Sequence, residues 1–100
     1  MRIVGRQVLE AFCRRHPDAR RWVEHWLADA DSATWRTPFE LKSSYAAVSF
    51  LAGSVVIFNV KGNSYRIEAT IAYRVGVLSV DWAGTHAAYH RRNRRRGRRS

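Results

Sequence analysis

The sequence predicts an α+β domain in which a short N-terminal strand and a helical hairpin pack on a mainly antiparallel sheet, with a short C-terminal helix or tail. Three observations lead to this class. Apolar residues recur at helical spacing on both sides of a Pro-containing turn, His16-Pro17-Asp18. The run from Tyr65 to Tyr73 alternates apolar and polar residues, as in a strand with one buried face. A Gly62-Asn63 pair marks a tight turn between two strand-like segments.

The first half of the chain is predicted to be helical after a short strand at Arg2–Val4. One helix runs from Arg6 to Arg15, and a second follows the turn. Apolar positions three or four residues apart define one buried face on each. They are Val8, Leu9, Phe12 and Cys13, then Trp22, Val23, Trp26, Leu27 and Ala30. The segment Thr37-Pro38-Phe39-Glu40 has capping-box spacing with Pro at the first helical position, which predicts a third helix from Pro38 to about Ser44.

The second half is predicted to be a sheet. The expected strands are Ala47–Leu51, Val55–Val60, Tyr65–Tyr73 and Leu78–Trp82. A two-residue turn at 62–63 sets Asn59 opposite Arg66. Apolar matching in the next hairpin sets Ala69 opposite Trp82 and Arg66 opposite Thr85.

Paired residues share a face of a sheet. This register therefore gathers four polar side chains at one end, on the face away from a core face that holds Ile67 and Trp82. The four are Asn59, Lys61, Arg66 and Thr85.

The net charge of +10 is unevenly distributed. Residues 91–99 hold seven Arg and no acid, so residues 1–90 carry eleven basic against eight acidic groups. We therefore expect one small domain at 1–90 and a disordered, Arg-rich tail at 91–100. Such a tail binds polyanions, although a charge run of this kind is also common as a merely solvated segment.

The remaining composition argues for a cytoplasmic protein. The single cysteine, Cys13, excludes an internal disulfide and lies on an apolar helix face, which favours a buried, inert thiol. The N-terminal segment lacks the apolar stretch of a signal peptide, and the longest uncharged run is too short and polar to span a bilayer. His86 and His90 are four residues apart, but no Cys or carboxylate cluster accompanies them, so no metal or other cofactor is expected.

The residues that carry chemistry lie at the ends of the predicted strands. Lys61, Arg66, His86 and Tyr89 have no carboxylate beside them in the sequence. They offer positive charge, hydrogen-bond donors, a group that titrates near neutral pH and a ring that can stack on a base, which suits RNA. Lys61 and Arg66 suit charge stabilisation at a phosphate, and His86 suits acid or base catalysis.

Tyr89 could stack on a splayed base or orient the 2′-OH. The residues expected to bind RNA around this site are Asn59, Asn63, Thr85, His90, Arg91, Arg92, Arg94, Arg95 and Arg96.

Each of these residues also has a plainer interpretation. Arg66 could pair across the sheet with Glu68 or Asp81 on a solvated face. Lys61 beside a Gly-Asn turn is usually a solubility charge, His86 after a strand is more often a turn or capping residue, and Tyr89 is more often packed in the core. Their convergence at one end of the sheet favours the functional interpretation.

Two motifs carry a resemblance to a known family. The segment FNVKGNSYRI followed by GTHAAYH resembles the HigB-type toxins of the RelE/ParE superfamily, and the HPDA turn, the TWRTP segment and the order of elements agree with it. The resemblance covers roughly residues 1–90. It implies a RelE-like fold and a metal-independent toxin that cleaves mRNA in the ribosomal A site. It also implies a helix-turn-helix antitoxin of the HigA type. The family often has an acid after the Tyr of the second motif, where this chain has His90.

Three functions remain open at this point. The first is an endoribonuclease toxin that acts on ribosome-bound mRNA through attack of the 2′-OH and thereby inhibits translation. The second is a non-catalytic RNA- or ribosome-binding module that acts through the basic tail. The third, a gyrase-directed toxin on the same fold, is disfavoured because the GTH-xx-Y end resembles the mRNA-cleaving branch.

Overall fold

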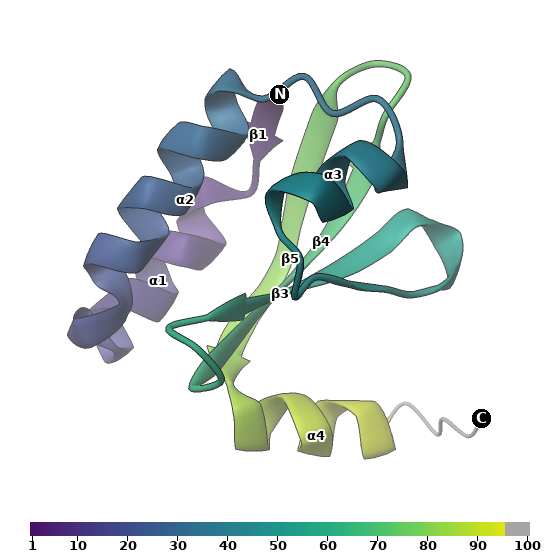
Figure 1. The fold of residues 1–100 in the computed structure, drawn as a ribbon. Helices are drawn as coiled ribbons and strands as arrows, with labels where there is room; N and C mark the ends of the chain where they lie inside the picture. The colour runs from purple at the N-terminus through teal and green to yellow at the C-terminus, as the bar shows by residue number, and fades with distance from the viewer. Residues whose placement is uncertain (96–100) are drawn as a thin grey trace.

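A computed structural model describes residues 1–95, which form a mixed five-stranded sheet and four α-helices (Figure 1). The described elements, in chain order, are β1 (Arg2–Val4), α1 (Arg6–Arg15), the 3₁₀ turn η1 (Pro17–Ala19), α2 (Arg20–Ser32), α3 (Pro38–Ser44), β2 (Ser49–Phe50), the 3₁₀ turn η2 (Ala52–Ser54), β3 (Val55–Val60), β4 (Tyr65–Ala72), β5 (Val77–Thr85) and α4 (His86–Arg95). The sheet order is β1-β5-β4-β3-β2, with β1 parallel to β5 and the other pairs antiparallel. The predicted α+β class, with its helical hairpin and short C-terminal helix, is confirmed.

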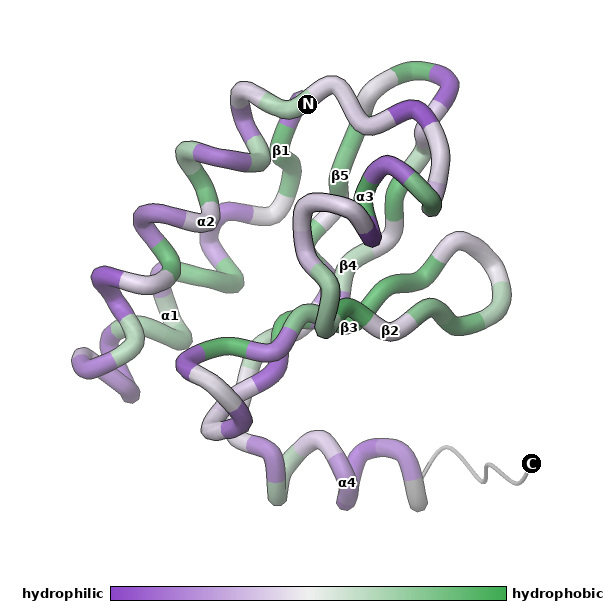
Figure 2. The backbone as a smooth tube through the Cα atoms, in the orientation of Figure 1, coloured by the Kyte–Doolittle hydropathy of each residue, from purple (hydrophilic) through white to green (hydrophobic). Residues whose placement is uncertain are grey.

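The hairpin of α1 and α2 covers one face of the sheet and forms the core with it (Figure 1). Phe12 of α1 and Trp26 of α2 are buried, and the Trp26 ring meets Phe58 of β3 edge-on at 5.1 Å. Cys13 is buried as predicted, and this burial raises the pKa of its thiol. Figure 2 shows hydrophobic residues concentrated in the strands and on the covered helix faces, whereas α4 is mainly hydrophilic.

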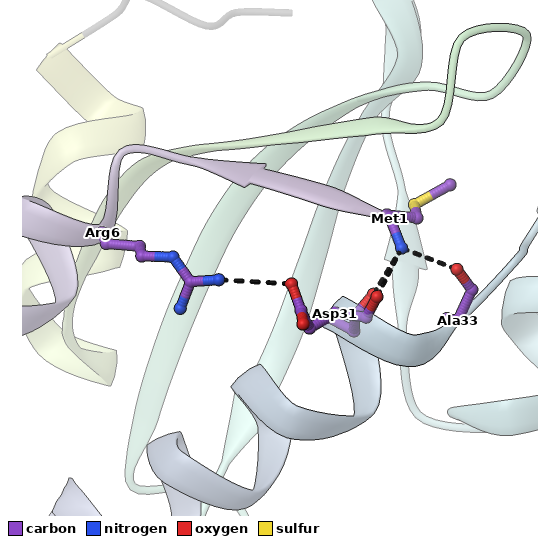
Figure 3. A network of polar contacts seen from close by, with 5 residues as sticks. Met1, Arg6, Asp31 and Ala33 are labelled. Atoms are coloured by element: carbon purple, nitrogen blue, oxygen red, sulfur yellow. Dashed lines mark hydrogen bonds and ion pairs between the residues drawn. The ribbon is translucent and has the colours of Figure 1, made fainter.

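A polar network ties β1 to the end of α2 (Figure 3). The backbone nitrogen of Met1 donates to the carbonyl oxygens of Asp31 at 3.0 Å and Ala33 at 2.6 Å, and Arg6 pairs with the Asp31 carboxylate at 3.3 Å. These bonds satisfy carbonyls that the end of α2 would otherwise leave without a helical partner. They hold the strand beside β5, where Ile3 pairs with Leu78.

Helix α3 begins where the capping pattern predicts. Thr37 is the N-cap, and its hydroxyl accepts a hydrogen bond from the Glu40 amide at 3.2 Å. The Glu40 carboxylate accepts a hydrogen bond from the amide of Arg36 at 2.8 Å, one residue earlier than the usual capping box requires. The helix ends at Ser44, as predicted.

The register of β3 with β4 is confirmed, since Asn59 pairs with Arg66 and Phe58 with Ile67. The predicted register of β4 with β5 is wrong. Ala69 lies opposite Val80 and not Trp82, and a register shift follows between Glu68 and Ala69.

Beyond this shift, Trp82 pairs with Glu68, Gly84 with Arg66, and Thr85 with Tyr65. The error has two parts. On the turn side Ala72 pairs with Val77, which already sets the pairing two residues away from the predicted register. Beyond Ala69 a β-bulge follows, because β5 contributes one extra residue, Asp81, between Val80 and Trp82.

The bulge reverses which side chains of β5 face the core. Trp82 shares the face of Glu68, so the prediction that it packs with Ile67 in the core is wrong. Thr85 shares the face of Tyr65, which contacts Phe12 of α1, so the prediction that Thr85 lies beside Arg66 on one face is also wrong. The face of Arg66 therefore meets α4 and not the helical hairpin.

Several predicted boundaries differ from the structure. Strand β4 ends at Ala72 and not at Tyr73, and β5 extends from Val77 to Thr85, beyond the predicted range Leu78–Trp82. The first strand of the sheet region is shorter than Ala47–Leu51, because regular pairing is limited to Ser49–Phe50 before the turn η2. The tail predicted for 91–100 is helical over 91–95, as part of α4, so the prediction of disorder is wrong for that part. The rest of the predicted tail, 96–100, lies outside the described residues.

Candidate functional site

Arg66, His86 and Tyr89 come together where β5 passes into α4. The Arg66 guanidinium donates to the Asn63 side-chain oxygen at 2.8 Å and lies 3.3 Å from Nε2 of His86. Its central carbon lies 5.8 Å from the centre of the Tyr89 ring. The Glu68 or Asp81 partners of the plainer interpretation are not among the contacts of Arg66 in the described structure. A guanidinium held only by neutral groups keeps its charge for an incoming anion.

The start of α4 fixes the position of His86. Thr85 precedes the helix, and its hydroxyl accepts a hydrogen bond from the amide of Ala88 at 3.0 Å, which is the role of an N-cap. The His86 amide donates to the carbonyl of Ser64 in the β3–β4 turn at 3.2 Å. Thr85 is thus a structural residue of the site, and its hydroxyl is engaged within the protein.

Gly84 explains the first residue of the GTH motif. A side chain at this position would bring a Cβ to 2.7 Å from the indole of Trp82. The absence of a side chain therefore lets the Trp82 ring lie across the strand on the face that meets α4. Trp82 in turn contacts the Tyr89 ring, with centroids 6.0 Å apart.

His86 and His90 form a close pair on one side of α4. Their Nε2 atoms are 2.6 Å apart, and their ring centroids are 4.4 Å apart with an interplanar angle of 36°. Partial burial, followed by the charges of Arg66 and His90, lowers the pKa of His86 below the ordinary value of 6.5. His86 is consequently neutral, and able to accept a proton, at neutral pH.

A buried ion pair attaches α4 to the sheet. Glu68 of β4 is 3% exposed, and its carboxylate accepts a hydrogen bond from the Arg92 guanidinium at 3.2 Å. The same guanidinium lies over the Trp82 ring, 5.3 Å from its centre. Arg92, which the sequence suggested as an RNA contact, is instead engaged inside the protein. The sequence did not predict that Glu68 anchors α4, because the wrong register placed Trp82 in the core. No residue of β5 was then expected beside Glu68 on the face that meets α4.

Lys61 belongs to a different cluster. Its ammonium group pairs with Asp18 at 3.2 Å, and the Tyr65 hydroxyl donates to the same carboxylate at 2.8 Å. The Tyr65 hydrogen bond and, less strongly, Lys61 lower the pKa of Asp18. No carboxylate lies beside Lys61 in the sequence. In the fold, however, the His16–Ala19 turn places the Asp18 carboxylate next to the Lys61 ammonium group.

The other predicted RNA contacts are divided between structural and exposed positions. Asn63 supports Arg66, and Asn59 donates to the carbonyl of Ala47 at 3.4 Å. Arg91 is exposed on α4. Arg94 and Arg95 belong to the described part of α4, and Arg96 lies outside the described residues.

The described residues contain no group of three or more His, Cys, Asp or Glu side chains arranged to hold a metal ion. No helix in the same part of the chain is long and apolar enough to cross a membrane.

The fold and the site define a class of small, basic α+β proteins. In this class, positively charged side chains and histidines gather at one end of a mainly antiparallel sheet. Within this class, the sequence model of one family, HigB_toxin, described as the RelE-like toxic component of a toxin-antitoxin system, matches residues 19–92. The match covers most of the chain, including the motifs at 58–67 and 84–90, so the chain belongs to this family. No curated relative matches it. Membership identifies a toxin with an antitoxin as its partner.

Proposed function

We propose that this toxin is a ribosome-dependent endoribonuclease of a type II toxin–antitoxin system, which cleaves mRNA in the ribosomal A site in the cytoplasm and so inhibits translation. The observation that carries the proposal is the contact between Arg66 and His86. A guanidinium without a carboxylate partner lies there beside an imidazole whose lowered pKa keeps it neutral. These are two of the three groups that cleavage of RNA by its own 2′-OH requires, and the third is an acid that protonates the departing 5′-oxygen.

The proposed chemistry follows from these positions. His86 accepts the proton of the 2′-OH through Nε2 and the 2′-oxygen attacks the adjacent phosphorus. The bond to the 5′-oxygen breaks, and this oxygen takes up a proton from a general acid or from water. Arg66 stabilises the charge that develops on the phosphorane oxygens. Tyr89 stacks on a displaced base or orients the 2′-OH. Lys61, on the other side of the β3–β4 turn, leaves its ion pair with Asp18 and binds a neighbouring phosphate of the RNA.

The proposed partners are the ribosome with its mRNA and a helix-turn-helix antitoxin of the HigA type. The net charge of +10 supports the first of these, because a basic surface is attracted to ribosomal RNA. The non-catalytic alternative, a ribosome-binding module that acts through its arginines, relies on the same charge. It needs neither His86 nor Tyr89.

Product analysis on isolated ribosomes distinguishes the endoribonuclease from the non-catalytic ribosome-binding module. The purified protein is added to ribosomes that hold a defined mRNA, and the ends of the fragments are identified. Cleavage that leaves a 2′,3′-cyclic or 3′-phosphate is expected, whereas a 3′-hydroxyl end would indicate attack by water and contradict the mechanism. Binding without any cleavage would favour the non-catalytic module.

The cellular counterpart of this experiment is induction with and without the antitoxin. Expression of the protein alone should arrest growth and translation, and co-expression of the adjacent helix-turn-helix gene should restore both. Normal growth with soluble protein present would count against a toxin active in that host.

A further inference from the structure

The contact between His86 and His90 is unusually short, and its length restricts where the protons lie. A hydrogen bond across 2.6 Å between two ring nitrogens holds a single hydrogen, because two N–H groups cannot face each other at that distance. The contact therefore links the two imidazoles through one hydrogen, and a pair linked in this way can carry one additional proton between its two rings.

Arg66 decides which ring holds that proton. Its guanidinium lies 3.3 Å from Nε2 of His86 and can act only as a donor there. Nε2 of His86 must then present its lone pair, and the shared hydrogen resides on Nε2 of His90. His90 is exposed and is one helical turn farther from β5.

We propose that His90 is a second catalytic residue, the general acid that protonates the departing 5′-oxygen while His86 acts as the general base. This inference rests on the proposed function and deepens it. Among the described residues, the charged or titratable groups in contact with the two rings are Arg66 from β4 and Tyr89 from α4 itself. An arginine cannot supply the proton, because its guanidinium remains protonated throughout.

The reaction balances on the pair alone. The 2′-O–H bond breaks and its proton passes to Nε2 of His86. The 2′-O–P bond forms, the P–5′-O bond breaks, and the 5′-oxygen takes the proton from Nε2 of His90. The pair starts and ends with one additional proton, which has moved from His90 to His86.

After the reaction, the contact between the two rings restores the starting protonation state of the site. Transfer of one hydrogen across the Nε2–Nε2 contact returns the proton to His90 without exchange with solvent. Because the 2′- and 5′-oxygens lie on opposite sides of the phosphorus in an in-line displacement, the contact belongs to the free and resetting enzyme. The two rings separate around the phosphate when RNA is bound.

The test compares His90→Asn with wild type and with His25→Asn, a matched change at an exposed histidine of α2. Single-turnover cleavage of ribosome-bound mRNA is measured over a pH range that brackets histidine titration on both sides. We expect His90→Asn to lose on the order of 10²-fold or more in rate and to lose the decline at high pH that reports the acid. His25→Asn should match wild type.

A second measurement follows the histidine side chains by ¹⁵N NMR and requires no activity. In wild type, the titrations of His86 and His90 should be coupled and occur in two steps. In His90→Asn, His86 should titrate in one step and at higher pH, because the variant lacks the neighbouring charge. A wild-type rate and profile in His90→Asn would overturn the proposal and leave the endoribonuclease intact. Independent one-step titrations in wild type would overturn it as well. Absence of cleavage by wild type, with coupled titration present, would instead refute the proposed function on which His90 catalysis depends.

Discussion

Arg66 is held at the candidate site by neutral groups, and this determines what it can do. Asn63 fixes one edge of the guanidinium and the Tyr89 ring covers it, while His86 contacts the other edge. An arginine paired with a carboxylate would have to exchange that partner for a phosphate. Arg66 has no such exchange to make within the described structure.

Replacement of Arg66 or His86 by Ala should remove at least about 10²-fold of the cleavage rate, because in the proposed mechanism Arg66 stabilises charge on the phosphorane and His86 accepts the proton of the 2′-OH. The free energy of unfolding should change by less than about 0.5 kcal/mol, since neither residue belongs to the core. Arg74→Ala, in the exposed β4–β5 turn, is the matched control for removal of one arginine. Cleavage assays and thermal unfolding on the same preparations check this. An unfolded variant would show that the residue is structural.

The pKa of His86 predicts the acidic side of the pH profile. Because this pKa is lowered from 6.5, the neutral form persists below pH 6.5, and the rate should fall only as the pH drops through the lowered value. Arg66→Gln removes the second-largest cause of the shift, so NMR titration should show the pKa of His86 rising part of the way back. Partial burial, the largest cause, remains. An unchanged pKa in this variant would mean that Arg66 and His86 do not interact in solution.

At the scale of elements, α4 is positioned by contacts on the far side of the sheet from the core. Glu68, Arg92 and Trp82 form a layer beneath the helix, and the Trp82 ring extends to Tyr89. The bulge at Asp81 makes this layer possible, because it turns Trp82 away from the hairpin and toward α4. The geometry of the site therefore depends on one extra residue in β5.

Arg92→Ala should lower the free energy of unfolding by about 1.5–3 kcal/mol, the range for a hydrogen bond to a charged group. It should also reduce cleavage by displacing Tyr89 and His90. Arg91→Ala removes the same charge from an exposed position one residue earlier and should leave stability within about 0.5 kcal/mol of wild type. Chemical denaturation of the two variants provides the comparison. Equal stability of both would show that the Glu68 pair contributes little.

The elements differ in how far the sequence could predict them. The helix faces and the β3–β4 register follow from local signals, namely apolar spacing and the Gly62-Asn63 turn, and both are confirmed. The β5 register depends on a bulge that no local pattern marks, since Leu78, Val80 and Trp82 alternate as an uninterrupted strand would. The prediction is wrong there, and it places Thr85 and Trp82 on the wrong faces. The Lys61–Asp18 pair escapes prediction for a similar reason, because it joins residues 43 positions apart in the sequence.

At the scale of the whole molecule, the described arginines include some that pair with carboxylates of the same chain and others that are exposed. Arg6, Arg20 and Arg92 form ion pairs with carboxylates of the same chain. Arg91 is exposed, and further arginines follow it along the sequence. Arg92 thus contributes to positioning α4, whereas Arg91 adds exposed positive charge to the same helix.

Deletion of 96–100 removes three arginines and retains all of the described residues, including α4 from His86 to Arg95. It should flatten the salt dependence of ribosome binding by roughly 0.7–0.9 log units for each phosphate that the shortened protein no longer neutralises. Cleavage at saturating ribosome should survive, because Arg66, His86 and Tyr89 are unchanged. A triple variant with Ala at the exposed Arg15, Arg36 and Arg74 controls for the same reduction of charge elsewhere. An equal change of slope in both proteins would show that only net charge matters.

The parallel pairing of β1 with β5 has a consequence for how the toxin is made. The strand at residues 2–4 pairs with residues 77–79, so β1 leaves the ribosome well before its partner strand has been synthesised. The residues at the start of α4 that complete the candidate site come later still, after the partner of β1 has been synthesised. A nascent chain that has not yet reached β5 consequently lacks both the strand that pairs with β1 and the α4 residues of the candidate site.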